Sequence, residues 1–169
     1  MAATVRVWDP LVRILHWTLA VAFLVAWLTE DDLMTVHIAA GYVVLAAVGV
    51  RTLWGFVGTK HARFTDFIYK PARVFSYLGD LVRFRGKRYL GHSPAGGAMT
   101  VLLLVLAAVI GWSGIEADAG NRLLEEIHES LGNIAIVVVL LHIGGVALAS
   151  LVHRENLPRA MVTGDKRAE

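Results

Sequence analysis

Four of the seven histidines in this sequence lie inside long apolar segments, where an imidazole is costly and an ionisable residue is a functional candidate by default. The other three are expected to be solvated or interfacial: His61, His92 and His153. Within their segments the four fall at two depths of a membrane. His37 and His128 lie toward one face, and His16 and His142 lie toward the other. The sequence therefore predicts two pairs of imidazoles.

The last apolar segment carries one member of each pair. His128 and His142 are fourteen residues apart, so on a helix they point about 40° apart and are separated by roughly 21 Å. Two imidazoles at one level suit an electron-transfer haem, because both axial positions of the iron are filled. A zinc site would need four ligands drawn together. We therefore predict two haem b groups, with His16 and His142 as axial ligands of the inner iron and His37 and His128 as axial ligands of the outer iron.

Small residues follow the four histidines, at helical spacing that places several of them on the same face as a ligand. They leave room for a porphyrin ring: Ala20, Gly41, Gly132, Gly144 and Gly145. Small residues also serve plain helix packing, and a single membrane histidine can be a hydrogen-bonded core residue. Two depth-matched pairs favour the haem interpretation over both alternatives.

Two arginines lie near the inner pair and are candidate cofactor-binding residues that would pair with haem propionates. Arg13 precedes His16 by three residues, and Arg51 lies toward the same end of the second apolar segment. Snorkelling of both side chains to lipid phosphate is the alternative. Arg122, the one cation of the outer links, is a candidate for the outer haem.

Four apolar segments must position these side chains. The chain is 56% hydrophobic, its mean hydropathy is +0.59, and a membrane span needs about 20 residues. Asp9-Pro10 and Ser93-Pro94 are typical helix starts, with a capping residue before a proline. The first segment has no A-x-A-like cleavage site after it, so we expect it to be retained. We predict an all-α membrane protein, a four-transmembrane-helix bundle forming a single domain over 1–169, with helices over 11–29, 33–57, 97–115 and 127–152.

The distribution of Lys and Arg along the sequence predicts how the segments are oriented in the membrane. The links 29–32 and 116–126 hold one basic residue, while the other fifteen Lys and Arg lie in the N-terminal stretch up to Arg13, the 51–97 region and the tail after 152. The positive-inside rule therefore predicts cytoplasmic termini and a cytoplasmic middle loop, and in the inner membrane of a bacterial cell the two short acidic links would face the periplasm. Apolar residues at helical spacing over 71–89 predict an amphipathic helix lying on anionic lipid headgroups. A basic loop with incidental helix is the alternative.

The absence of cysteine excludes disulfides, thiolate metal sites, iron–sulfur clusters and covalent haem attachment through C-x-x-C-H. No feature of the sequence points to nucleic acid as a partner. Membrane lipid is the partner expected from the apolar segments.

Several stretches resemble the bacterial cytochrome b561 family, which includes the b-type cytochrome subunits of nickel-iron hydrogenases. They are VWDPLVRILHW (7–17), RTLWGFVGTKHARFTDF (51–67), YLGHSPAGGAM (89–99), HES (128–130) and LHIGGVALASLVHRENLPRAMVTG (141–164). The resemblance implies a four-helix bundle with two b haems, ligated by one histidine on each of the first two helices and two on the fourth. That ligand set corresponds to His16, His37, His128 and His142.

The resemblance also implies electron transfer between the quinone pool and a partner. The outer links here are shorter than those of the hydrogenase subunits, which favours a free-standing cytochrome or a partner of a small periplasmic c-type cytochrome. Residues around Trp54 and the GHSPAGG stretch (91–97) are candidates for the quinone site.

We therefore predict a dihaem cytochrome b that moves electrons across the membrane between a periplasmic redox partner, such as a c-type cytochrome, and the quinone pool. The alternative is a stand-alone membrane oxidoreductase that passes electrons from a small diffusible donor, such as superoxide, to quinone. A metal or proton carrier without haem would use the same histidines, and purified protein without a Soret band would favour it.

Overall fold

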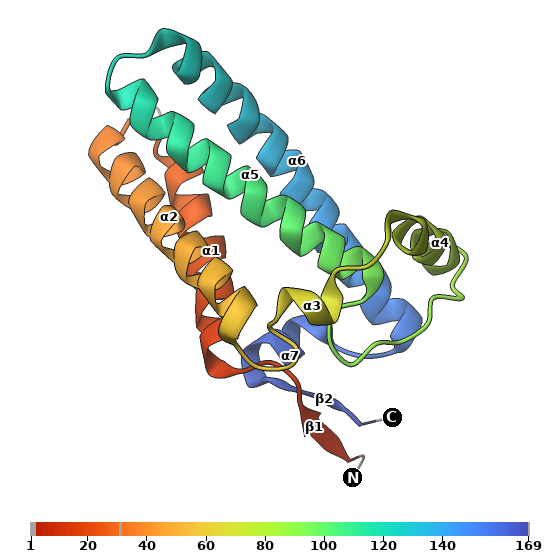
Figure 1. The fold of residues 1–169 in the computed structure, drawn as a ribbon. Coiled ribbons are helices and arrows are strands. Elements are labelled where there is room, and N and C mark those ends of the chain that lie inside the picture. Colours follow the sequence, from red (N-terminus) through yellow and green to blue (C-terminus); the bar gives the residue numbers. More distant parts are fainter. Residues whose placement is uncertain (1–2, 31, 169) are drawn as a thin grey trace. The chain divides into compact units, whose positions relative to one another are not determined.

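The structure is a computed structural model that describes residues 3–30 and 32–168. Of the predicted segments, Asp31 in the link 29–32 and the outermost residues of both tails lie outside this described part. The elements occur in the order β1 (Thr4–Arg6), α1 (Pro10–Leu28), α2 (Met34–Val57), α3 (Phe64–Phe67), α4 (Pro71–Val82), α5 (Pro94–Asp118), α6 (Arg122–His153), α7 (Leu157–Thr163) and β2 (Asp165–Arg167) (Figure 1).

Four long apolar helices, α1, α2, α5 and α6, confirm the predicted membrane spans. Local capping explains where three of them begin. The Asp9 carboxylate accepts a hydrogen bond from the backbone N–H of Val12 (2.9 Å) before α1, and Ser93 Oγ accepts one from Gly96 (3.1 Å) before α5. Asn121 accepts a bond from the N–H of Leu124 (3.3 Å) before α6. The four spans are therefore set largely by signals local to each helix.

The prediction of a link over 116–126 was wrong at both ends. Helix α5 continues to Asp118 and α6 begins at Arg122, so most of the supposed link is helical. The turn between them includes Gly120, whose φ of +93° suits glycine because it has no Cβ. A helix can continue through polar and acidic residues once the chain has left the apolar core of the membrane.

The chain divides into two compact units, and each of the four long helices contributes to both. Unit 1 comprises the segment up to Arg13, Trp54–Val101 and the segment from Leu140 onward. Unit 2 comprises Ile14–Leu53 and Leu102–Val139.

Unit 2 is built from parts of the four long helices. Ala22 of α1 and Val44 and Val48 of α2 are buried together, and apolar side chains of α5 pack against them. Helix α5 approaches α2 closely at Gly111, where an added Cβ would lie 2.5 Å from the Leu45 side chain. Many large apolar side chains of these helices stay exposed, among them Val43 and Val137. That exposure suits a lipid environment, because lipid removes the cost of leaving such side chains uncovered.

Unit 1 joins the two ends of the chain. Strands β1 and β2 form an antiparallel ribbon in which Val5 pairs with Lys166 (Figure 1). Beneath it lies a small core of buried side chains: Val7, Trp8, Val12, Ala62 and Ala160. The all-α prediction omitted this ribbon, because strands of three residues leave no readable alternation and their partners lie at opposite ends of the sequence.

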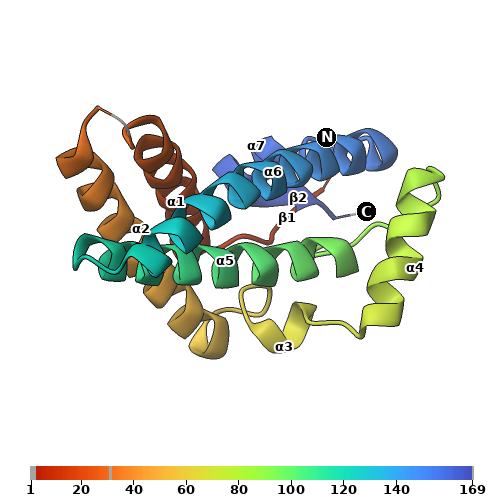
Figure 2. The same cartoon turned by 90° about the horizontal axis from the view of Figure 1, so that it is seen from above.

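Helix α4 confirms the helix predicted within 71–89 and shows which of its residues pack on the rest of unit 1. The sequence pattern groups Phe75, Leu78 and Leu81 on one apolar face. In the structure Tyr77 and Leu81 are buried, whereas Phe75 is 72% exposed and Val82 and Leu78 are also exposed. Figure 2 shows α4 running across the direction of the C-terminal part of α6. The helix therefore packs on unit 1 by one stripe and leaves a second apolar stripe uncovered.

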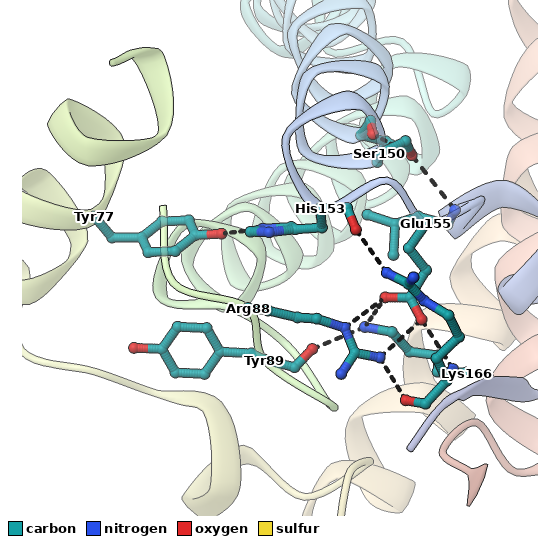
Figure 3. Close-up of polar contacts among 10 residues, drawn as sticks. Tyr77, Arg88, Tyr89, Ser150, His153, Glu155 and Lys166 are labelled. Carbon is teal, nitrogen blue, oxygen red and sulfur yellow. Dashed lines mark hydrogen bonds and ion pairs between the residues drawn. The ribbon is translucent and has the colours of Figure 1, made fainter. Parts of the chain in front are cut away.

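A buried carboxylate ties three distant segments of unit 1 together (Figure 3). Glu155, just after α6, forms ion pairs with Arg88 (2.9 Å) and Lys166 (3.6 Å), and it accepts a hydrogen bond from the backbone N–H of Arg167 (3.0 Å). Burial alone would raise the pKa of Glu155. The hydrogen bonds from Arg88 and Arg167 and the charges of Lys166 and Arg88 outweigh burial, and lower that pKa to about 2.

We expect Glu155→Gln to destabilise the protein at neutral pH. The native pKa lies below the ordinary value of 4.5, so the carboxylate contributes stability above about pH 4.5, and that contribution is lost as the pH falls toward 2. The loss at neutral pH is about 3 kcal/mol. Thermal melts of the detergent-solubilised protein should show a lower midpoint for the variant at pH 7 and a shrinking difference in acid. Asp165→Asn, which removes an exposed pair with Arg6 (3.8 Å), should change little. A difference between Glu155→Gln and the wild type that persists unchanged in acid would contradict this role.

Candidate haem site

Helices α2 and α6 bring His37 and His128 together in unit 2. Their ring centroids lie 5.8 Å apart, and the ring planes are inclined at 76°. Both residues come from the pair that the sequence places at one depth.

Each of these rings is held by a backbone carbonyl of a neighbouring helix. His37 Nδ1 lies 2.8 Å from the carbonyl oxygen of Ala26, at the end of α1, and His128 Nδ1 lies 2.9 Å from that of Ile110 in α5. A carbonyl only accepts hydrogen bonds, so Nδ1 is the protonated nitrogen in both rings. The Nε2 lone pair is then left for a metal, which is the arrangement usual for metal-ligating histidines.

Helix α5 shapes the position of the His128 ring through two residues that were not predicted from the sequence. Ser113 is fully buried (0% exposed), and its hydroxyl donates to the same Ile110 carbonyl (2.9 Å). An added Cβ on Gly114 would lie 2.8 Å from His128 Cε1, so glycine permits the close approach. A serine followed by a glycine in an apolar helix was the only available signal, and nothing in it points to His128.

The geometry of this pair fits a haem. Two imidazoles that held one iron would have ring centres about 6 Å apart, since each metal–nitrogen bond would be about 2 Å long. An added Cβ on Gly41 or Gly132 would meet no atom within 4 Å, so there is space on the faces that carry the two histidines. Across residues 3–30 and 32–168 no three His, Cys, Asp or Glu side chains gather as a bare-ion site would require. Two protein ligands and an open space fit an iron whose other ligands come from a porphyrin.

The predicted inner pair is divided between the units. His16 lies on the part of α1 in unit 2, where its ring makes an edge contact with Trp17 (5.2 Å between centroids). His142 lies half-buried on the part of α6 in unit 1. Added Cβ atoms on Gly144 and Gly145 would also meet nothing within 4 Å. The pairing of His16 with His142 stays a prediction.

The two predicted arginines have different surroundings. Arg13 donates from Nη1 to the carbonyl of Val162 in α7 (2.5 Å), so it has a structural role at the C-terminal end of that helix. Arg51 on α2 is only 5% exposed, although it lies in a membrane-spanning helix. A guanidinium so deeply buried is expected to be retained for a specific interaction. Propionate binding by Arg13 and Arg51 stays a prediction.

The segments suggested for a quinone site are packed into unit 1. Trp54 Nε1 donates to Asp9 (3.1 Å), and Thr59 Oγ1 donates to the same carboxylate (2.6 Å). Burial favours a raised pKa for Asp9, but the bonds from Thr59, the Val12 N–H and Trp54 outweigh it and lower the pKa. The His92 ring lies against Trp8 (4.8 Å between centroids) and Phe67 (4.3 Å). Packing thus accounts for much of these motifs.

Comparison with known proteins supplies the context for this geometry. The family described as prokaryotic cytochrome b561 matches residues 7–164. A protein of Bradyrhizobium diazoefficiens named "Probable Ni/Fe-hydrogenase B-type cytochrome subunit" is 25% identical over 97% of this chain and 86% of its own length. Proteins with the same name from Azotobacter chroococcum and Azotobacter vinelandii are each 26% identical over 95% of this chain and 87% of their own. No solved structure matches the chain.

Proposed function

The chain belongs to the prokaryotic cytochrome b561 family, and from that premise we propose that it is a dihaem cytochrome b that moves electrons across the membrane. It is a multi-pass protein of the bacterial inner membrane and a b-type cytochrome of electron transport. The proposed route runs between a periplasmic redox partner, such as a c-type cytochrome, and the quinone pool.

The observation that carries the proposal is the joint placement of His37 and His128. These two side chains would hold the outer haem iron, each through Nε2, while the carbonyls of Ala26 and Ile110 fix the ring orientations. A bis-histidine haem accepts and returns single electrons with little rearrangement of its ligands. The protein's part is to hold the two rings, exclude water with apolar helices, and set the donor strength of each imidazole.

The inner haem is proposed from the family pattern and from sequence. Helix α6 runs without a break from Arg122 to His153 and carries both His128 and His142. His16 would supply the second ligand of the inner iron, with Arg13 and Arg51 as partners for propionates. A haem at each depth would provide two stations for an electron crossing the membrane.

We propose that unit 1 faces the cytoplasm and that α4 lies in the membrane interface. Unit 1 contains fourteen of the sixteen Lys and Arg, and unit 2 contains eight Asp and Glu against two Arg. On α4 the uncovered apolar stripe of Phe75, Leu78 and Val82 is followed by Arg83, Arg85 and Lys87. Exposed apolar residues beside basic residues suit contact with anionic lipid.

The acidic end of unit 2 supports a basic periplasmic partner. Exposed carboxylates gather in the segments joining α1 to α2 and α5 to α6 and in their flanking turns: Glu30, Asp32, Asp118, Glu125, Glu126 and Glu129. The names of the curated relatives attach them to a hydrogenase, so a redox-protein partner accords with the family. An electrostatic interface of this kind gives association that weakens as salt rises. Quinone is the proposed partner on the cytoplasmic side, near Trp54 and residues 91–97.

The test is a haem count and a redox titration on the purified full chain. We expect two haem b per chain by the pyridine haemochrome method and two one-electron waves. In liposomes, an added c-type cytochrome and a quinone analogue should exchange electrons only through the protein. One haem per chain would overturn the dihaem proposal. Turnover with superoxide and a quinone analogue, without any added cytochrome, would favour the stand-alone oxidoreductase.

A further inference from the structure

The carbonyl of Ile110 accepts two hydrogen bonds from side chains in the structure. One comes from His128 Nδ1 (2.9 Å), and the other comes from the Ser113 hydroxyl (2.9 Å). Ser113 Oγ itself lies 3.4 Å from His128 Nδ1. The hydroxyl and the imidazole N–H therefore share one acceptor, and Ser113 itself has no exposed surface.

Sharing an acceptor has a predictable effect on the imidazole. Each donor draws on the electron density of the carbonyl oxygen, so a second bond weakens the first. The bond at Nδ1 in turn sets how strongly Nε2 donates to a metal, because a stronger bond gives the ring more imidazolate character. A stronger donor favours ferric over ferrous iron. A hydroxyl on the Ile110 carbonyl thus favours the reduced state of a haem held by His128.

We propose that Ser113 is a positioning residue that raises the reduction potential of the outer haem by weakening the hydrogen bond from His128 to Ile110. This inference rests on the proposed outer haem held by His37 and His128. A buried serine in an apolar helix bonds a carbonyl of the preceding turn in any case. The test must therefore separate that local role from an effect exerted through His128.

The other ring of the pair provides a matched comparison. The Ala26 carbonyl, which accepts from His37 Nδ1, is also approached by a hydroxyl three residues later, that of Thr29. Here the hydroxyl lies 3.3 Å away and makes its shorter bond, 2.7 Å, to the carbonyl of Val25. The Ala26 carbonyl also accepts the backbone N–H of Thr29 (3.3 Å), a bond that a side-chain substitution leaves in place. His37 therefore competes with the Thr29 hydroxyl only at long range. Removing the Thr29 hydroxyl should affect the haem less than removing that of Ser113.

The experiment is a redox titration of the purified dihaem protein and of Ser113→Ala, with electron paramagnetic resonance of the oxidised forms. In Ser113→Ala we expect the equilibrium constant for reduction of the outer haem to fall about threefold, which is about 30 mV at 59 mV per tenfold. The low-spin signal of that haem alone should shift, and two haems per chain should remain. Ser113→Cys, with a weaker donor of similar size, should give an intermediate shift. Thr29→Val should shift the potential less than Ser113→Ala does.

An unchanged outer potential in Ser113→Ala, an equal shift of both haems, or an equally large shift in Thr29→Val would each overturn the inference. If Ser113→Ala does not retain haem, Ser113→Cys carries the test by the same criteria. Failure of the proposed function looks different. In that case His37→Leu and His128→Leu would leave both haems in place, whatever Ser113 does. A haem lost in those variants together with a silent Ser113→Ala would refute the serine's role alone.

Discussion

Replacing His128 with leucine is expected to leave one haem per chain in place of two. The variant removes one of the two rings whose centroids lie 5.8 Å apart, and the remaining His37 is a single axial ligand in a space shaped for two. Leucine is apolar and of comparable size, so helix α6 should persist in the membrane. Haem content by pyridine haemochrome should fall to about half, and one of the two redox waves should disappear. His37→Leu should give the same loss.

A histidine elsewhere on α6 supplies the control. His153 is the last residue of the helix, eleven residues after His142, and its Nε2 lies 3.4 Å from the Tyr77 hydroxyl. His153→Leu should therefore retain both haems. If His128→Leu kept two low-spin haems with unchanged potentials, the assignment of the outer ligands would be wrong.

Replacing Gly114 with alanine should impair the outer haem without touching a ligand. An added Cβ would lie 2.8 Å from Cε1 and 3.0 Å from Nδ1 of His128, so the imidazole must move. Moving it stretches the bond to the Ile110 carbonyl, which holds the ring in orientation. Loss of the hydrogen bond that orients a metal-ligating histidine typically weakens metal binding by about 10- to 100-fold. Titration of the stripped protein with hemin should show the weaker site, while the other haem binds as before.

Gly111 offers a control on the same helix. An alanine there would also crowd a neighbour, since the added Cβ lies 2.5 Å from the Leu45 side chain. A leucine side chain can shift without disturbing either ring. Gly111→Ala is therefore expected to lower thermal stability and keep two haems at normal affinity. Equal loss of haem in both variants would indicate general damage to α5, and the specific role of Gly114 would be withdrawn.

The sequence alone determined the four spans and predicted a depth for each of the four histidines in them. Both are local properties: a span is a run of apolar residues long enough for the hydrocarbon, and depth is a position within that run. Helix α4 was likewise readable from the spacing of its apolar residues. The packing face of α4 was not, because Tyr77 and Leu81 are buried by parts of unit 1 that are remote in sequence.

Only the tertiary structure decided how the rings are held. The atoms that bind His37 and His128 are the backbone carbonyls of Ala26 and Ile110, and every residue has a carbonyl. The side chains at those two positions therefore do not predict the hydrogen bonds to the histidines. Ser113 and Gly114 matter to the site because α6 brings His128 against them on α5. Ser113 and His128 are fifteen positions apart, and no local sequence pattern predicts this contact. Periodicity can place an imidazole at a depth, but its orientation depends on which carbonyl the neighbouring helix presents.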